Sequence, residues 1–268
     1  MSYKLCLPNY RNRYLFIKEN LELLSKGRVF GRILNVGAGE GDYDALIASY
    51  AGRLLSFDIN KSDIAFAKKL NTNIRNIDYL ACDALRLSFA DNSFDLVISA
   101  EVIEHVGQPE KLMEEAGRVL KPGGILIVTF PQLNFPFTED PINKILSFFT
   151  KKKLPIGAYA FGHKYLIPVE DFKKWAGKNH LKIIGEKNLS GYIIALLEMY
   201  WPGVVQNIIK FNLFNTTGVK KFGLRPSADE PFLAVFTDMI IRADYALFKK
   251  SKCSVAKGFV LLNEKGQA

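Results

Sequence analysis

The sequence predicts a doubly wound α/β fold with a mostly parallel sheet, and three observations support this. Short apolar strands alternate with helices over about 100 residues, a pattern typical of parallel strands joined by crossover helices. A glycine-rich turn at residues 37–41 follows the first strand and precedes a helix. Acidic residues, Asp58 and Asp83, end the next two strands. Helices are therefore expected to cover both faces of the sheet.

The individual elements follow from the spacing of apolar residues between turn residues. Strands are expected at the short apolar runs, which are residues 33–36, 54–58, 78–82, 94–99, 125–130, 181–186 and 257–263. Helices are expected at the longer amphipathic stretches, which are residues 9–25, 42–50, 62–70, 109–120 and 169–180. Ser62 is the expected N-cap of the helix at 62–70, because its hydroxyl can accept a backbone hydrogen bond.

Composition limits the class of protein and its partners. The chain has 268 residues, 49% of them hydrophobic, which suffices for one large α/β domain with an insertion. The three cysteines, Cys6, Cys82 and Cys253, are too widely separated for a disulfide framework, which fits a reducing cytoplasm. No export signal is expected. The net charge of +9 favours anionic partners such as nucleic acid, anionic lipid or an acidic substrate, although a solvated basic surface explains it equally well.

The spacing of the glycines argues against a dinucleotide ligand. Gly37, Gly39 and Gly41 let the backbone turn tightly and approach a ligand, and the following helix offers free N–H groups. The dinucleotide fingerprint GxGxxG requires its third glycine at the position of Asp42. A carboxylate there suits a pyrophosphate poorly, so a ligand without one is favoured over NAD or FAD.

The two strand-end acids indicate a nucleoside. Asp58 stands where a carboxylate can accept hydrogen bonds from both hydroxyls of a ribose, and Asp83 stands where a side chain can reach an adenine amino group. Each acid taken alone fits a helix cap or turn residue. Two acids, each at the end of its strand, favour a ligand at the carboxyl edge of the sheet, where open α/β sheets bind ligands.

Three segments in order resemble the class I S-adenosylmethionine-dependent methyltransferases. Residues 33–41, ILNVGAGEG, are similar to the first motif of that family. Residues 91–106, DNSFDLVISAEVIEHV, resemble the fourth-strand region of the branch that includes quinone-ring methyltransferases. Residues 119–124, VLKPGG, look like the turn before the fifth strand. The resemblance covers roughly residues 30–132.

The resemblance implies a Rossmann-like sheet of seven strands with an antiparallel last strand, and S-adenosyl-L-methionine as cofactor. The turn would hold the amino-acid end of the cofactor, Asp58 its ribose and Asp83 its adenine. Many relatives carry an acid at the position of Asn35, which keeps an acceptor but lacks the charge. The cofactor-binding residues implied are Asn35, Gly37, Ala38, Gly39, Gly41, Asp58, Ile59, Asp83, Ala84 and Ala100.

Catalytic candidates are few because the chain has three histidines. Methyl transfer needs no metal, and it needs a base only where the acceptor must lose a proton. His105 follows the fourth strand and is either a base at the mouth of the site or a structural residue. His163 lies in a Gly-His segment that lines the acceptor side in similar methyltransferases. His180 is expected to cap a helix end.

An apolar helical insertion is expected before the last strand, at residues 189–253. The methyltransferase domain would then comprise residues 1–188 and 254–268. Residues 192–214 and 231–248 both combine a wide apolar face with a narrow polar stripe, and Asp238 and Arg242 form an i, i+4 pair on the polar side. The insertion is either a lid or an in-plane pair of membrane helices. Cationic residues flank both runs, namely Lys210, Lys220, Lys221, Arg225, Lys249, Lys250 and Lys252.

These patterns together predict an enzyme that methylates oxygen or carbon of an apolar or lipid-linked acceptor. A cytoplasmic protein, peripheral on the inner membrane face, would fit this acceptor. Two alternatives remain open at this stage. One is an RNA methyltransferase that uses the basic surface, although no RNA-binding module is recognisable. The other is a methyltransferase-like membrane adaptor without turnover.

Overall fold

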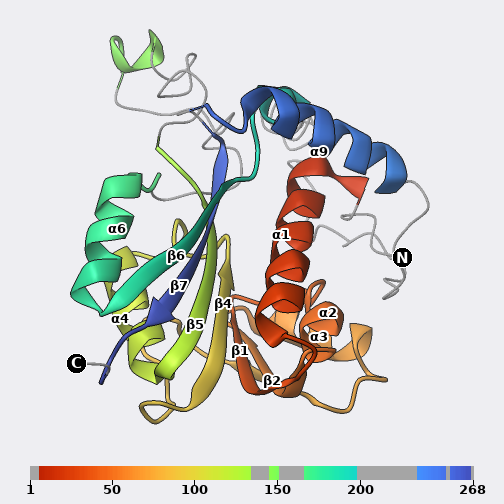
Figure 1. The fold of residues 1–268 in the computed structure, drawn as a ribbon, viewed down its shortest axis with the longest axis vertical. Helices are drawn as coiled ribbons and strands as arrows, with labels where there is room; N and C mark the ends of the chain where they lie inside the picture. Colours follow the sequence, from red (N-terminus) through yellow and green to blue (C-terminus); the bar gives the residue numbers. More distant parts are fainter. Residues whose placement is uncertain (1–5, 134–144, 151–165, 198–233, 252–253, 267–268) are drawn as a thin grey trace. The chain divides into compact units, whose positions relative to one another are not determined.

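A computed structural model describes residues 6–133, 145–150, 166–197, 234–251 and 254–266. Its sheet has seven strands in the order β3-β2-β1-β4-β5-β7-β6 (Figure 1). The strands are β1 (Phe30–Val36), β2 (Ala51–Asp58), β3 (Ile77–Ala81), β4 (Phe94–Ala100), β5 (Leu120–Pro131), β6 (Leu181–Asn188) and β7 (Ala256–Asn263). The expected seven strands are therefore present, and most boundaries differ by only a few residues.

Strands β1 to β5 are parallel, and β7 runs against them. β1 pairs with β2 and with β4, β2 pairs with β3, and β4 pairs with β5, all in parallel register. At one end of β7 the Asn263 side chain donates to the carbonyl of Leu120, 3.0 Å away. Near the other end, the Gln132 N–H donates to the carbonyl of Val255, also at 3.0 Å. Because the start of β5 meets the end of β7, the expected antiparallel last strand is confirmed.

Helices cover the sheet on both faces. The helices of the described residues are α1 (Pro8–Ser25), α2 (Asp44–Ala48), α3 (Lys61–Leu70), α4 (Pro109–Val119), α6 (Val169–Lys178), α7 (Tyr192–Ala195) and α9 (Ala234–Phe248). Figure 1 shows α4 and α6 on one face of the sheet and α2 and α3 on the other. This arrangement confirms the doubly wound α/β prediction.

The expected N-cap of α3 is wrong by two residues. Asn60, in an extended conformation, is the cap, and its side-chain oxygen accepts from the Ser62 backbone N–H at 3.0 Å. The Ser62 hydroxyl donates to the same oxygen at 2.8 Å. Asparagine and serine are both good N-caps, so the choice depends on where the chain enters the helix, which the sequence pattern does not fix.

Three phenylalanines pack together in the core between the sheet and α6, among mostly aliphatic residues. Phe130 of β5, Phe172 of α6 and Phe259 of β7 are fully buried. The Phe172 ring centroid lies 4.8 Å from that of Phe130 and 4.6 Å from that of Phe259. Burial of such rings contributes on the order of 2–3 kcal/mol each to folding. These contacts join the last strands of the sheet to the helices that cover them.

The chain divides into two compact units. The larger unit comprises Arg13–Phe130, Ile167–Lys187 and Gly258–Ala268, and it contains β1 to β4 with the turn at residues 37–41. The other unit comprises Met1–Asn12, Pro131–Leu166 and Asn188–Lys257. The expected domain boundaries at residues 189 and 253 remain a prediction.

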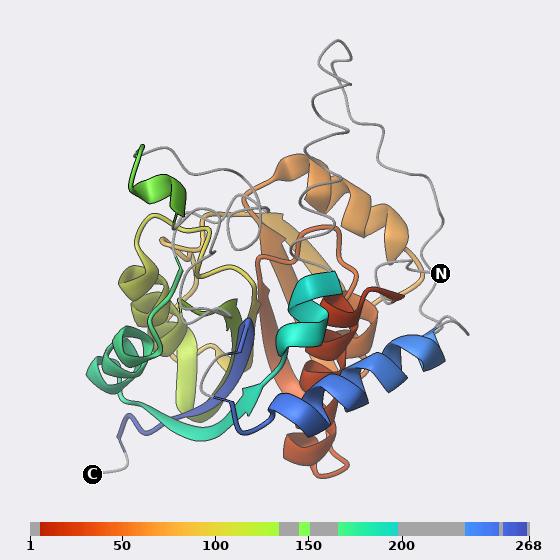
Figure 2. The ribbon, with the colours of Figure 1, turned by 90° about the horizontal axis from the view of Figure 1, so that it is seen from above.

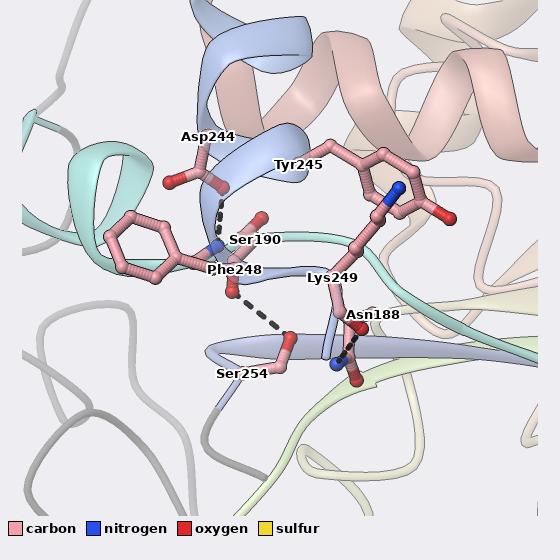
Figure 3. A pocket seen from close by; sticks show the side chains of 8 residues that line it. Asn188, Ser190, Asp244, Tyr245, Phe248, Lys249 and Ser254 are labelled. Carbon is pink, nitrogen blue, oxygen red and sulfur yellow. Dashed lines mark hydrogen bonds between the residues drawn. The ribbon is translucent and has the colours of Figure 1, made fainter. Parts of the chain in front are cut away.

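In the second unit, α7 lies against α9 (Figure 2). Asp244 of α9 is buried, and its carboxylate accepts hydrogen bonds from the backbone N–H groups of Gly191, at 2.5 Å, and Ile193, at 2.9 Å. The Tyr192 and Phe248 ring centroids are 4.9 Å apart. Figure 3 shows Asp244 and Phe248 reaching from α9 toward the Ser190 segment. The hollow that these residues line has no room for a water-sized molecule, so it is not a ligand site.

The helices expected in the insertion are described only in part. The run at 192–214 begins with α7, and residues 198–233 lie outside the described residues. The run at 231–248 contains α9. In the parts of the chain that the structure describes, no helix has both the length and the apolarity needed to span a bilayer.

Candidate cofactor site and active site

The turn after β1 has the left-handed backbone that its glycines permit. Gly37, Gly39 and Gly41 have φ values of 69°, 53° and 77°. A Cβ at Gly37 would meet a methyl carbon of Val102 at 2.3 Å, whereas a Cβ at Gly39 would meet no atom of a described residue within 4 Å. Glycine at position 37 is therefore required for packing under the turn, and the face of the turn at Gly39 is open.

Asp58 holds this turn against the end of β2. One carboxylate oxygen accepts from the Gly39 N–H at 2.9 Å, and the other accepts from the Asn60 N–H at 2.8 Å. The Ala38 N–H donates to the carbonyl of Phe57 at 2.8 Å. A carboxylate oxygen has two lone-pair positions, so these bonds leave Asp58 with acceptor capacity. The structure therefore brings the predicted turn and the predicted ribose acid together.

Asn35 lies beneath the turn, with its side chain directed at Asp44. Its amide donates to Oδ1 of Asp44 at 2.8 Å, and the Ser56 hydroxyl donates to the same oxygen at 2.7 Å. Asn35 and Asp44 are both buried. Burial raises the pKa of Asp44, and the hydrogen bonds from Ser56 and Asn35 lower it. The acid beneath the turn is thus supplied by α2, a partner that the sequence reasoning missed.

The residues that follow β2 and β3 are accessible. The Ile59 side chain is 73% exposed, although it is apolar. Asp83 is exposed and follows β3, and its Oδ1 accepts from the Leu85 N–H at 2.9 Å. Ala84 is half-buried beside it, and Ala100, at the end of β4, is also half-buried. The predicted cofactor-binding residues therefore follow neighbouring strands at one edge of the sheet.

An ion pair that the sequence did not reveal stands at the end of β4. Glu101 has a left-handed backbone, with φ of 56°. Its carboxylate lies 2.7 Å from a guanidinium nitrogen of Arg13, in α1, and accepts from the Thr129 hydroxyl at 3.1 Å. Its N–H donates to the carbonyl of Thr129 at 2.9 Å. These bonds hold a conformation that costs on the order of 1 kcal/mol in a non-glycine residue.

Glu104 is a fully buried carboxyl group beside this pair. In the described part of the chain neither of its carboxyl oxygens has a hydrogen-bond partner. Burial raises the pKa of Glu104 well above its usual value, the charge of Glu101 raises it further, and Arg13 lowers it. An isolated buried carboxylate is costly, so burial favours the protonated form of this group.

The three histidines lie in different places. The His105 side chain is 40% exposed, and its Nε2 lies 3.8 Å from a carboxyl oxygen of Glu104. His105 is therefore at the carboxyl end of β4, as expected. His163 lies outside the described residues. His180 lies near the end of α6 as expected, with φ of 57° and its carbonyl accepting from the Glu264 N–H at 2.9 Å, but the C-cap of α6 is Asn179, so the cap expected at His180 is wrong by one residue.

Comparison with known proteins identifies the family. The chain matches the family model described as a methyltransferase domain over residues 34–128. It is 30% identical over 190 residues to the ubiquinone/menaquinone biosynthesis C-methyltransferase UbiE of Haemophilus ducreyi, which covers 63% of this chain and 71% of the relative. The chain belongs to the class I S-adenosylmethionine-dependent methyltransferases, in the quinone-ring branch.

Two further comparisons agree with this assignment. The demethylmenaquinone methyltransferase of Renibacterium salmoninarum is 27% identical to this methyltransferase over 187 residues, covering 65% of this chain and 76% of the relative. The structure of the N-methyltransferase NodS from Bradyrhizobium japonicum with S-adenosyl-L-homocysteine shares the fold. Its TM-score is 0.53 at 20% identity, covering 70% of this chain and 83% of NodS. The predicted enzyme class and the predicted cofactor, S-adenosyl-L-methionine, are confirmed.

The residues at the strand ends fit this cofactor. An open backbone turn at Gly39 can receive a polar amino-acid group, because no atom of the residues that the structure describes lies within 4 Å of a Cβ built there. Asp58 keeps acceptor capacity for hydroxyl groups. The exposed Ile59 offers an apolar surface to an aromatic base. The open turn, the Asp58 carboxylate and the exposed Ile59 are therefore chemically compatible with a nucleoside that carries an amino-acid tail.

Proposed function

We propose that this methyltransferase transfers a methyl group to a ring carbon of an apolar, quinol-type acceptor. The observation that carries this proposal is the similarity to two relatives, one named as a C-methyltransferase of ubiquinone/menaquinone biosynthesis and the other as a demethylmenaquinone methyltransferase. That similarity extends over more than 60% of the chain. A quinol agrees with the apolar acceptor that the sequence predicts, and it narrows the predicted choice of oxygen or carbon to carbon.

In this proposal the cofactor lies along the carboxyl ends of β1, β2 and β3. The turn at 37–41 binds its amino-acid end, with Gly39 and Ala38 at the open face. Asp58 accepts from the ribose hydroxyls and Ile59 packs on the adenine. Asp83 accepts from the adenine amino group, next to Ala84. Asn35 acts from below by holding Asp44 under the turn, and Ala100 borders the reacting centre.

The cofactor supplies an electrophilic methyl group on a sulfonium. The protein must align the acceptor carbon with that methyl and exclude water. Transfer to a ring carbon would require the acceptor hydroxyl to give its proton to a base in the protein, and the proton then released from the methylated carbon would be balanced by return of a proton to that oxygen, so that one proton leaves overall. We propose His105 as the base, because its imidazole is exposed at the end of β4. The predicted role of His163 also stays a proposal.

The cofactor assignment is tested by calorimetry with S-adenosyl-L-homocysteine. Asp58→Asn keeps an acceptor for the turn but removes the charge, and hydrogen bonds to a charged group contribute about 1.5–3 kcal/mol each. Loss of two ribose bonds should weaken binding about 100-fold or more. Asp171→Asn, at an exposed position of α6, is the matched control and should bind normally. Equal affinity of both variants would contradict the site.

The acceptor is tested with methyl-deuterated cofactor and demethylmenaquinol in detergent. We expect a product with a labelled methyl on the quinone ring, detected by mass spectrometry. His105→Gln should lower kcat and alter its pH profile without changing affinity for the cofactor. Labelling of tRNA without labelling of the quinol would favour the RNA alternative, for which the net charge of +9 is the supporting observation. That result would refute the acceptor and leave the enzyme class intact.

A further inference from the structure

Helix α9 buries two polar residues, Thr237 and Asp244, and exposes most of its large apolar side chains. The buried stripe comprises Ala234, Thr237, Ile241 and Asp244. The Thr237 hydroxyl donates to the carbonyl of Cys6 at 2.8 Å, and Asp244 accepts from the start of α7. A surface helix of a globular protein normally shows the reverse pattern, with its apolar stripe inside. Packing among the described residues therefore does not explain why the outward side of α9 is apolar.

The outward face of α9 comprises seven residues opposite the buried stripe. All are exposed, and they are Val235, Phe236, Met239, Arg242, Ala243, Ala246 and Leu247. Phe236 is 60% exposed, Met239 64% and Leu247 68%. With a rotation of about 100° per residue, Met239 and Ala246 lie at the centre of this face. A contiguous apolar surface of this kind is uncommon on a soluble monomer and marks an interaction site.

The charges around this face are cationic. Arg242 lies at its border, and Lys249 and Lys250 are exposed just beyond the end of the helix. None of the three has an ion pair with another described residue. The acidic residues of α9 are occupied elsewhere, because Asp244 is buried and Asp238 lies 2.9 Å from the guanidinium of Arg11. The expected pair of Asp238 with Arg242 is therefore wrong, and Arg242 is free to meet an anionic partner.

We propose that the outward face of α9 docks on the interface of an anionic phospholipid bilayer. The helix would lie in the membrane plane, with Phe236, Met239 and Leu247 among the acyl chains. Its cationic residues would contact the phosphate groups. Charge complementarity favours this occupant over a second copy of the chain, because a symmetric dimer through the same face would bring like charges together. The proposal concerns the membrane-facing surface and does not depend on the identity of the acceptor.

This surface gives the predicted localisation a physical basis. Burial of a large apolar side chain contributes a factor of about ten or more to partitioning, and each lysine or arginine near an anionic surface about fivefold. The electrostatic part is screened by salt within about 10 Å at 0.1 M ionic strength. Binding should therefore need both the apolar face and anionic lipid, and it should weaken as salt is added.

The experiment is flotation of the full chain with vesicles of phosphatidylcholine alone or mixed with phosphatidylglycerol. We expect retention on the mixed vesicles only. Met239→Glu, at an exposed position, should lower the partition coefficient at least about tenfold. Leu23→Glu is the matched control, because Leu23 is 72% exposed on α1, and it should bind as the wild type does. The double variant Lys249→Glu and Lys250→Glu should bind poorly and lose its salt dependence.

Three results would overturn the proposal. The first is absence of vesicle binding by the wild type, and the second is equal binding by the Met239→Glu and Leu23→Glu proteins. The third concerns self-association, measured by sedimentation velocity. If the wild type is an oligomer and the Met239→Glu variant is a monomer, the outward face of α9 binds a second copy of the chain. A Met239→Cys variant should be alkylated rapidly in solution and protected by anionic vesicles. Slow alkylation in both conditions would mean that another part of the chain covers the face, and would also refute the proposal.

Discussion

The packing beneath the glycine turn makes a sharp prediction about two substitutions of similar backbone strain. Gly37→Ala and Gly39→Ala both place a Cβ on a left-handed residue, with φ of 69° and 53°. Gly37→Ala alone adds a steric overlap, because its Cβ would lie 2.3 Å from Cγ2 of Val102 and 3.2 Å from Cγ1. The two variants therefore separate the cost of conformation from the cost of packing.

The expected magnitudes follow from these contacts. An alanine in the left-handed conformation lowers the free energy of unfolding by about 1–2 kcal/mol. Because alanine also makes the unfolded chain less flexible than glycine does, this loss is offset by about 0.4–1 kcal/mol. Gly39→Ala should thus lower the free energy of unfolding by about 1 kcal/mol. Gly37→Ala adds an overpacking cost of about 1–3 kcal/mol, because the β-branched Val102 has few rotamers in which to move away. In total, Gly37→Ala should lower the free energy of unfolding by about 2–4 kcal/mol.

The costs of conformation and of packing can be measured by urea denaturation. The proteins compared are both glycine variants, Val102→Ala, and the double variant Gly37→Ala/Val102→Ala. Val102→Ala leaves the Val102 Cβ, 3.3 Å from the new methyl, as the nearest atom of that residue. The double variant should therefore be more stable than the sum of the single changes predicts, by about 1–2 kcal/mol. If Gly37→Ala costs no more than Gly39→Ala, or if the two changes at 37 and 102 are additive, the argument from packing is refuted.

Three further predictions rest on buried groups. Glu104 holds its proton in the folded state above the pH at which the unfolded chain loses it, so stability should fall as pH rises above the usual glutamate pKa. Glu104→Gln should remove this dependence of the free energy of unfolding on pH. If the free energy of unfolding changes equally with pH in the variant and the wild type from pH 4 to pH 8, this prediction is contradicted. Gly258→Ala should cost about 1–3 kcal/mol in urea denaturation, because its Cβ would lie 2.5 Å from the Phe16 ring, and an unchanged midpoint would argue against that contact. Asp244→Ala should speed amide exchange at Gly191 and Ile193 at least about fivefold by removing charge-assisted bonds, and unchanged exchange there would show that the carboxylate does not hold α7.

The strands of the sheet and the parallel pairing of most of them were predictable because they depend on short-range patterns. Each strand is an apolar run between turn residues, and alternation with helices indicates parallel strands, whereas the order of the strands was not predicted. The turn at 37–41 and the positions of Asp58 and Asp83 were predictable for the same reason, since they depend on strand ends. The N-cap of α3 was missed because asparagine and serine are equally favourable at N-cap positions. Which of Asn60 and Ser62 is the cap depends on where the chain enters the helix.

The contacts that complete the site were not predictable because they join distant segments. Nothing in the local sequence relates Arg13 to Glu101, or marks Glu104 as lacking a partner. The orientation of α9 was missed for a related reason. Periodicity finds the apolar and polar sides of a helix, but only tertiary contacts, here Asp238 with Arg11, decide which side is buried.

Beneath the cofactor turn, Asn35 is neutral and the carboxylate is supplied by Asp44, which affects how this chain can be engineered. A family-guided replacement of Asn35 by aspartate would set two carboxylates where an amide now donates to Asp44 across 2.8 Å. Both carboxylates would be buried, and Asp44 would lose the amide donor that now bonds its Oδ1, leaving the hydroxyls of Ser56 and Tyr79 as its donors. We therefore expect the double swap Asn35→Asp and Asp44→Asn to cost less stability than Asn35→Asp alone.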